Sequence, residues 1–334
     1  MAKFDYSQLR SQTGAALDRQ GSDAGRIVMI HSGVVIGLGL LLSVLSYLLD
    51  QGIAGTGGLS GIGARAMLET LQMVLQTANL VLLPFWTMGY TRAILSISRG
   101  EQVDARSLLW GFGNFGVVLR SMLLKGVILF ALAIVGGQLA SILFALTPAA
   151  KPMFELLEQM SAEGMTDPYA MLEHPAYQQL VVKMLPFMLV GMLLLLVPVF
   201  YRLRFADLVL VDRPQNGAVR SFLVSLHITK RKSLAVFRLD LYFWWFYLAQ
   251  GLILALGYGD VLLAMAGVNL GISADAAMFV FYIVALLCEF GLYVWRKNHV
   301  QITYALAYDE LIRDAVAQAQ PAAQSAPQNT EETI

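Results

Sequence analysis

The chain has 334 residues, of which 57% are hydrophobic and 14% are charged, with 23 basic and 23 acidic side chains. Soluble domains carry about 45–50% apolar and about 25% charged residues. The chain therefore has too little charge to cover a water-soluble globule of its size. This composition excludes an ordinary soluble domain and indicates an integral membrane protein.

Six apolar blocks follow one another along the chain. A helix rises about 1.5 Å per residue, so about 20 apolar residues cross the roughly 30 Å of hydrocarbon in a bilayer. The blocks occupy residues 27–49, 68–95, 117–146, 180–203, 234–256 and 276–295. They predict an all-α fold, a polytopic membrane bundle of six transmembrane helices within residues 27–314. Pro84, Pro186 and Pro198 interrupt two of the blocks, which we interpret as simple kinks.

The basic residues alternate between loops in a way that predicts the orientation of the chain. Loops on the cytoplasmic side of a membrane hold an excess of Lys and Arg. The leader at 1–26, the second and fourth loops and the start of the tail at Arg296 and Lys297 hold Lys and Arg, whereas the third loop is acidic. The fifth loop, residues 257–275, holds no Lys or Arg. We therefore expect both termini to be cytoplasmic.

Residues 215–230 are predicted to form a short amphipathic helix. Val219, Phe222, Leu223 and Leu226 follow the spacing i, i+3, i+4, i+7, which gives one apolar stripe. Together with neighbouring cations, the stripe makes a candidate surface for the anionic inner leaflet. This surface consists of Arg213, Arg220, Phe222, Leu223, Leu226, Lys230, Arg231 and Lys232. A helix that packs under the bundle without lipid contact has the same periodicity, so both alternatives stay open.

Three further segments lie outside the blocks. Residues 99–115 predict a second surface helix, which Asp104 can cap. The acidic loop contains PMFELLEQMSAEG at 152–164, which predicts a helix. Residues 315–334 are rich in Ala, Gln and Pro and have little to bury, so we expect a disordered cytoplasmic tail.

The sequence carries no recognisable catalytic motif. His31, His174, His227 and His299 lack metal-ligand spacing, and no phosphate-binding loop of the Walker type is present. The glycine-rich stretch at 52–65 does not match GxGxxG and follows no predicted strand, which favours a flexible turn. We therefore expect no enzyme activity, no cofactor, no metal and no nucleic-acid partner.

Lys125, Asp240 and Glu289 are charged residues inside three different apolar blocks, whereas Arg120, Lys183 and Arg238 lie nearer the ends of their blocks and can snorkel to the membrane surface. Counted from the basic ends of their blocks, the first three lie about 10 Å deep in the inner half of the bundle. An unpaired charge there costs on the order of 3 kcal/mol. The sequence therefore predicts a buried charge cluster in which Lys125 approaches Asp240 or Glu289. The alternative is separate snorkelling of Lys125, with Glu289 protonated or hydrated.

Several segments resemble a known family in their order and spacing. They are LPFWTMGYTRAILSISRGEQVDARSLLWGFGNF at 83–115, FADLVLVDRPQNGAVRSFLVSLHITKRKSLAVFRLDLYFWWF at 205–246 and YALAYDELI at 304–312. In these segments the chain resembles the bacterial multi-pass membrane proteins of domain-of-unknown-function family nine-seven-five. The leader at 6–18 resembles the opening helix of that family.

The resemblance rests on a limited set of positions. They are Gly89, Arg99 to Glu101, Gly111, Phe112, Asp212, Pro214, Ser221, Ser225, Lys230 to Phe237, Ala307, Tyr308 and Leu311. The chain lacks the glycine that the family usually has in the basic stretch, and its aromatic signature is reduced to LYFWW at 241–245. The resemblance implies a bacterial plasma membrane and six spans, and it implies no established activity.

Two classes of function follow from these observations. The first is a non-catalytic protein that organises membrane lipids, other membrane proteins or copies of itself through its inner-surface helices. The second is a small-solute or ion transporter that uses the buried charges. A continuous polar cavity joining the three charges would favour transport, and a dry bundle would favour the organiser.

Overall fold

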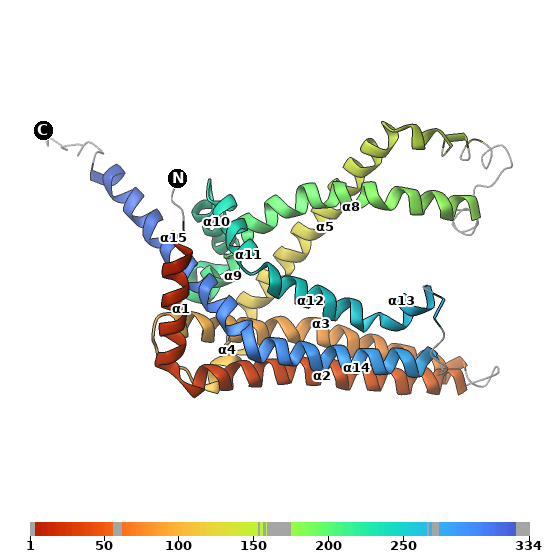
Figure 1. The fold of residues 1–334 in the computed structure, drawn as a ribbon, viewed down its shortest axis with the longest axis horizontal. Helices are drawn as coiled ribbons and strands as arrows, with labels where there is room; N and C mark the ends of the chain where they lie inside the picture. Colours follow the sequence, from red (N-terminus) through yellow and green to blue (C-terminus); the bar gives the residue numbers. More distant parts are fainter. Residues whose placement is uncertain are drawn as a thin grey trace, which may run out of the picture. The chain divides into compact units, whose positions relative to one another are not determined.

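The computed structural model describes residues 4–55, 62–152, 154, 155, 158, 175–265, 267, 268 and 274–324. Among these residues every regular element is a helix, which confirms the all-α fold (Figure 1). The chain divides into two compact units. The first joins Met1–Arg120 to Phe205–Ile334, and the second is Ser121–Arg204.

Five of the described helical segments are long and apolar enough to cross a membrane. Their helices are α2 (Ser22–Gly55), α3 (Ile62–Ser98), α5 (Phe115–Ala145), α8 (Pro175–Leu203) and α14 (Ala274–Leu292). Pro84 lies inside α3, and Pro186 and Pro198 lie inside α8. Most side chains in the apolar windows of these segments are not buried within the protein, which is the arrangement that a lipid environment favours. The helices fit a polytopic membrane bundle.

The fifth predicted block is not a straight helix. It bends by 66° between α11 (Ser233–Tyr242) and α12 (Trp244–Gly257), and it makes a sixth span only if this bent pair counts as one. Beyond Tyr258, α13 (Gly259–Met265) is helical and packs on α14. The loop predicted at 257–275 therefore contains a helix, because its residues Val261 to Met265 are apolar and find a partner helix.

The sixth block continues well past its predicted end. α14 leads into a π-helical turn, η5 (Tyr293–Lys297), and then into α15 (Asn298–Gln324). The expected disordered tail at 315–334 is thus helical as far as Gln324, and residues 325–334 lie outside the described part of the chain. Ala and Gln are good helix formers, so α15 extends where little side-chain surface is buried.

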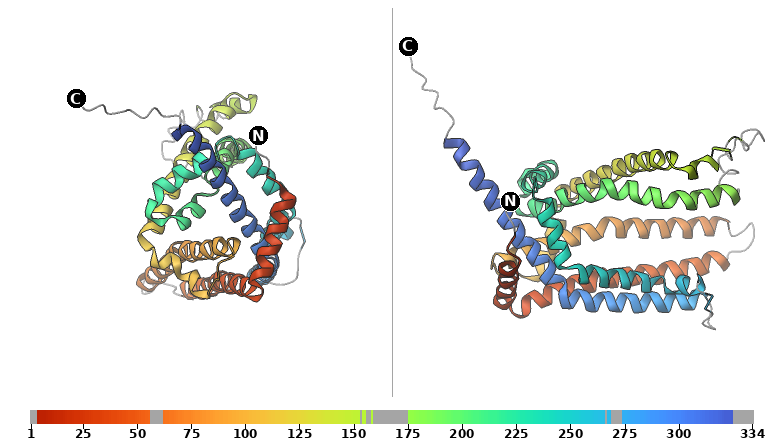
Figure 2. Two further views of the ribbon diagram at one scale, coloured as in Figure 1. Left: turned by 90° about the vertical axis from the view of Figure 1, so that its left-hand side faces the viewer. Right: turned by 45° about the horizontal axis from the view of Figure 1, so that its top comes forward.

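Short helices gather at one end of the first unit, which we call the polar end (Figures 1 and 2). They are α1 (Tyr6–Gln20), η2 (Ala105–Leu109), α4 (Trp110–Gly113), α9 (Ala206–Asp212), η4 (Pro214–Asn216), α10 (Gly217–Ile228) and α11. The chain enters through α1 and leaves along α15 at this same end (Figure 1). Asp5 begins α1, since its Oδ1 accepts hydrogen bonds from the backbone of Ser7 and Gln8.

The second surface helix expected at 99–115 is a 3₁₀ turn, η2, followed by the single turn of α4. Two glycines explain this tight geometry. A Cβ on Gly89 would overlap the backbone of Leu108, and a Cβ on Gly111 would overlap the backbone of Phe85. The expected helix cap is wrong, because the Asp104 side chain makes no capping hydrogen bond.

The second unit contains most of α5, the 3₁₀ turn η3 (Pro148–Ala150) and α8. α5 and α8 approach closely at two glycines, since a Cβ on Gly191 would lie 2.9 Å from the Gly136 carbonyl oxygen. Small residues allow such close packing between helices in membranes. Phe144 packs edge-on against Phe187 with 5.3 Å between ring centroids. Most of the acidic helix predicted at 152–164 lies outside the described residues.

Candidate functional site

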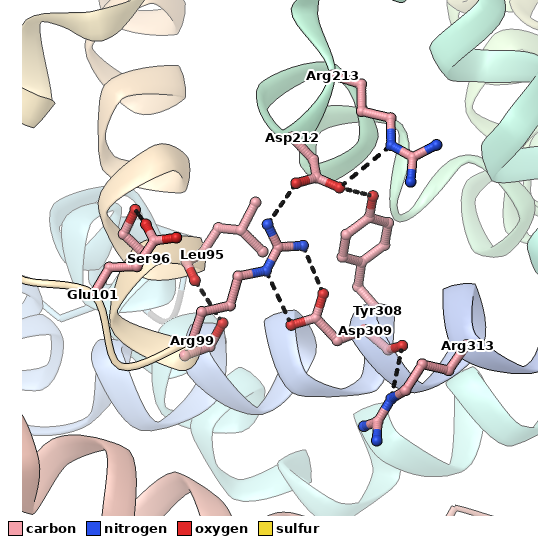
Figure 3. Close-up of polar contacts among 10 residues, drawn as sticks. Leu95, Ser96, Arg99, Glu101, Asp212, Arg213, Tyr308, Asp309 and Arg313 are labelled. Carbon is pink, nitrogen blue, oxygen red and sulfur yellow. Dashed lines mark hydrogen bonds and ion pairs between the residues drawn. The ribbon is translucent and has the colours of Figure 1, made fainter.

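Arg99 lies between two carboxylates at the polar end (Figure 3). Its Nη1 donates to Oδ1 of Asp212 at 2.5 Å, and its Nη2 donates to Oδ1 of Asp309 at 2.7 Å. Arg99 follows α3 directly, Asp212 ends α9, and Asp309 is on α15. One planar guanidinium, whose fork of donors suits two carboxylates, therefore joins three separate segments.

Tyr308 completes this ion-pair network. Its hydroxyl donates to Oδ2 of Asp212 at 3.0 Å, and its ring stacks on Phe205. Burial alone would lower the pKa of Arg99, but the hydrogen bonds to Asp212 and Asp309 and their charges raise that pKa above its ordinary value. The guanidinium thus stays charged, and both carboxylates are engaged. This geometry suits a structural joint better than a reaction centre.

The network brings together the segments that carry the family resemblance. Arg99 opens the RGE loop, Asp212 opens the DRP turn, and Tyr308 lies in the AYDEL helix. Glu101 of the same loop accepts a hydrogen bond from Ser96 Oγ at 2.7 Å. Spacing in the sequence did not predict this convergence, because the three segments are about 100 residues apart.

The predicted apolar stripe of α10 is divided between two faces of the helix. Phe222 is 4% exposed and faces the protein, whereas Val219 is 63% and Leu223 is 59% exposed. The buried face also contains Ser221 and Ser225, which the stripe had placed outside it. Small side chains let this face pack closely on α9. The stripe as predicted is therefore wrong, and Leu223 belongs to an outward apolar face.

α11 presents a second outward apolar face, which the sequence analysis assigned to a membrane span. Leu234, Phe237 and Leu241 are exposed and follow helical spacing. Val236 and Leu239 are buried on the opposite face. Both α10 and α11 thus carry apolar side chains on the inside and on the outside.

The predicted basic residues of this surface divide into two groups. Lys232 donates to Asp314 Oδ2 at 2.6 Å, and Arg213 lies 4.0 Å from Asp212. The side chains of Arg220 on α10 and of Lys230 and Arg231 in the turn between α10 and α11 are exposed. We define the helical surface as the exposed residues of these two successive helices and the turn that joins them: Val219, Arg220, Leu223, Lys230, Arg231, Leu234, Phe237 and Leu241.

The three predicted buried charges lie in different surroundings. Lys125 is in the second unit and Asp240 and Glu289 are in the first, so pairing of Lys125 with either carboxylate stays a prediction. Asp240 lies on α11 and accepts hydrogen bonds from Tyr247 and Tyr304. The carboxylate therefore has hydroxyl donors close by within its own unit.

Glu289 lies in a different polar environment, which includes a lysine that the sequence analysis assigned to the cytoplasmic tail. It hydrogen-bonds the Tyr293 hydroxyl and interacts electrostatically with Lys297. Both partners belong to the π-helical turn η5. The π-helical turn follows α14 without a break in the helix, and a sequence pattern does not reveal such a turn.

Lys297 is part of a buried cluster that sequence reasoning missed. Its Nζ lies 3.0 Å from Nε2 of His31 and 4.0 Å from the centroid of the Tyr293 ring. His31 stacks on Tyr90, whose hydroxyl donates to Asn298 Oδ1 at 2.8 Å. The only signal in the sequence is the position of His31 inside an apolar block.

Within the described part of the chain, no group of three or more His, Cys, Asp or Glu side chains is placed to hold a metal ion. Comparisons with family models, curated proteins and solved structures found no match for this chain. The resemblance to family nine-seven-five therefore stays a prediction from the motifs.

Proposed function

We propose that this protein is a non-catalytic membrane organiser that binds anionic lipid at one membrane face through α10 and α11. One observation carries the proposal: the helical surface combines outward apolar side chains with exposed cations. An amphipathic helix of this kind lies in the headgroup region, where its apolar face is buried and its cations attract anionic lipid.

The orientation belongs to the same proposal. The polar end faces the cytoplasm of a bacterium, and both termini are cytoplasmic. The support is the concentration of Lys and Arg in the segments of the polar end, together with the location of α1 and α15 at that end. Lipids drawn to this surface, other membrane proteins and copies of the chain are the partners that such a surface would gather.

We also propose that the chain is a divergent member of family nine-seven-five. The proposal is supported by the geometry of its motifs, because residues from three of them contact one another in the Arg99 network. Motifs that meet at one joint provide a physical reason for their common order and spacing. Their role would be to fix α9 and α15 against the end of α3.

The test of lipid binding uses the full chain purified in mild detergent. A lipid that binds the folded state raises the unfolding temperature. We expect phosphatidylglycerol to raise Tm more than phosphatidylcholine does. Replacing the three cations of the helical surface with Gln (Arg220, Lys230 and Arg231) should remove that preference, since each basic residue near an anionic surface contributes about 1 kcal/mol.

The matched control replaces three exposed arginines of other polar-end elements, Arg10, Arg106 and Arg313, with Gln. It removes the same charge and should keep the preference for phosphatidylglycerol. Equal stabilisation of the unchanged protein by both lipids would contradict the proposal. So would an equal loss of preference in the two triple variants, because binding would then depend on total charge alone.

A further inference from the structure

A cavity of about 900 Å³ opens between the long helices of the first unit. It is lined from α2, α3, α12, α13 and α14. Cavities of about 300–1,000 Å³ are the usual size of small-molecule sites, and they are mostly apolar with a few polar groups. This cavity has that composition. Its polar and charged lining residues include Ser43, Gln76, Asn79, Gln250, Asp260 and Glu289.

The charged lining of the cavity is entirely acidic. Asp260 and Glu289 line it, and no Lys, Arg or His is among the described lining residues. Asp260 lies in the first turn of α13, and Glu289 lies on α14 about two turns beyond Tyr282. Negative charges that line a cleft with low-dielectric walls create a potential that attracts cations. The cavity is therefore suited to a positively charged ligand.

Aromatic and apolar side chains make up the rest of the wall. Tyr47, Tyr258, Phe279 and Tyr282 supply rings whose faces attract cations. Ser43 Oγ donates to the Tyr282 hydroxyl at 2.9 Å, which fixes that ring between α2 and α14. An inorganic ion would leave most of this apolar wall without a partner, whereas an organic cation would fill it.

Lys297 is the cation that competes for Glu289. It interacts with Glu289 electrostatically, but its Nζ is held 3.0 Å from His31 Nε2, and it does not line the cavity. Glu289 therefore interacts with Lys297 and also lines the cavity. A ligand cation would share the carboxylate with Lys297.

We propose that this cavity is a binding site for a lipophilic organic cation, with Glu289 as its main anionic contact and Asp260 as a second. The site is separate from the helical surface of α10 and α11, so its test is independent of lipid binding. It shares Glu289 with the buried charge cluster expected from sequence, but neither Lys125 nor Asp240 lines it.

The probe is tetraphenylphosphonium, and its control is tetraphenylborate, an anion of nearly the same size and shape. Binding of each ion is measured by equilibrium dialysis to the full chain in phosphatidylcholine nanodiscs, with empty nanodiscs subtracted. We expect saturable binding of the cation and none of the anion. Equal binding of both ions would overturn the proposal, because it would indicate an apolar space that lipid chains fill.

Variants then identify the carboxylates. Glu289→Gln should weaken cation binding at least tenfold, and Asp260→Asn should weaken it by a smaller factor. The control is Glu69→Gln, which should leave cation binding unchanged because Glu69 is an exposed residue of α3 outside the cavity lining. Lys297→Gln should strengthen binding, since it removes the competing cation. Unchanged affinity for the cation in both carboxylate variants would overturn the assignment of the two contacts. If a variant fails to fold, the comparison of the two ions on the unchanged protein still tests the proposed cation site.

Discussion

Arg99 and Asp212 are 113 positions apart in the sequence, and their side chains meet at 2.5 Å. The Arg99 guanidinium also donates to Asp309, and the three side chains together form a joint between separate segments. The Arg99 side chain is 32% and the Asp212 side chain 13% exposed. The joint is thus partly withdrawn from water, and its loss should be measurable in stability.

Arg99→Gln should lower the free energy of unfolding by about 1–3 kcal/mol, between the values for exposed and buried ion pairs. Arg99→Lys should recover only part of this loss, because an ammonium lacks the planar fork that reaches two carboxylates. The measurement is the unfolding temperature of the full chain in detergent. The control is Arg106→Gln, whose side chain is 92% exposed, and an equal loss in that variant would contradict the joint.

Gly89→Ala and Gly111→Ala should each destabilise the protein by several kcal/mol, because overlap with backbone cannot be relieved by a rotamer change. The added methyl groups would overlap the backbone of Leu108 and of Phe85, respectively. Gly113→Ala is the matched control, since a Cβ there has nothing within 4 Å. Thermal unfolding of the three variants side by side provides the comparison. Similar Tm values for all three would show that η2 and α4 do not pack on α3 in this way.

The two faces of α10 should respond differently to truncation. Phe222→Ala should cost about 3–5 kcal/mol as a buried aromatic, whereas Leu223→Ala should change stability by less than about 0.5 kcal/mol. Both changes are measured in detergent, where no bilayer supports the outward face. A larger loss for Leu223→Ala would mean that the single stripe predicted from sequence describes the helix better.

The proposed orientation predicts which loops are accessible from outside the cell. In a Cys288→Ser background, a cysteine at Glu163 should react with a membrane-impermeant maleimide on intact cells. A cysteine at Gln215, in the basic loop, should react only after the cells are opened. Labelling of Gln215→Cys in intact cells would reverse the topology.

The long apolar helices follow from composition, because burial of about 20 apolar residues in lipid determines them before any tertiary contact forms. The bend near Phe243 and the π-helical turn at Tyr293–Lys297 are local departures from a straight helix. Hydropathy averages over such local changes. For this reason the fifth block was predicted as one straight span.

The surface residues show a similar limit. The spacing of Val219, Phe222, Leu223 and Leu226 identifies a helix, but it does not reveal that Ser221 and Ser225 share the inward face with Phe222. Ser221 can face inward because its Oγ donates to the Gly217 carbonyl oxygen at 2.8 Å within the helix. A prediction from polarity alone therefore places Ser221 on the wrong face of α10. The Arg99 joint forms between segments that are distant in the sequence, and a local sequence pattern does not predict such contacts.

The central claim is that the outward face of α10 lies in the lipid. A direct test attaches a bimane probe to Leu223→Cys in a Cys288→Ser background. The full chain is placed in liposomes whose lipids carry a nitroxide near the headgroup, and quenching of the bimane fluorescence is measured. Gln215→Cys, on the exposed turn before α10, is the reference position. We predict strong quenching at residue 223 and weak quenching at residue 215. Equal quenching at the two positions would contradict membrane contact by α10.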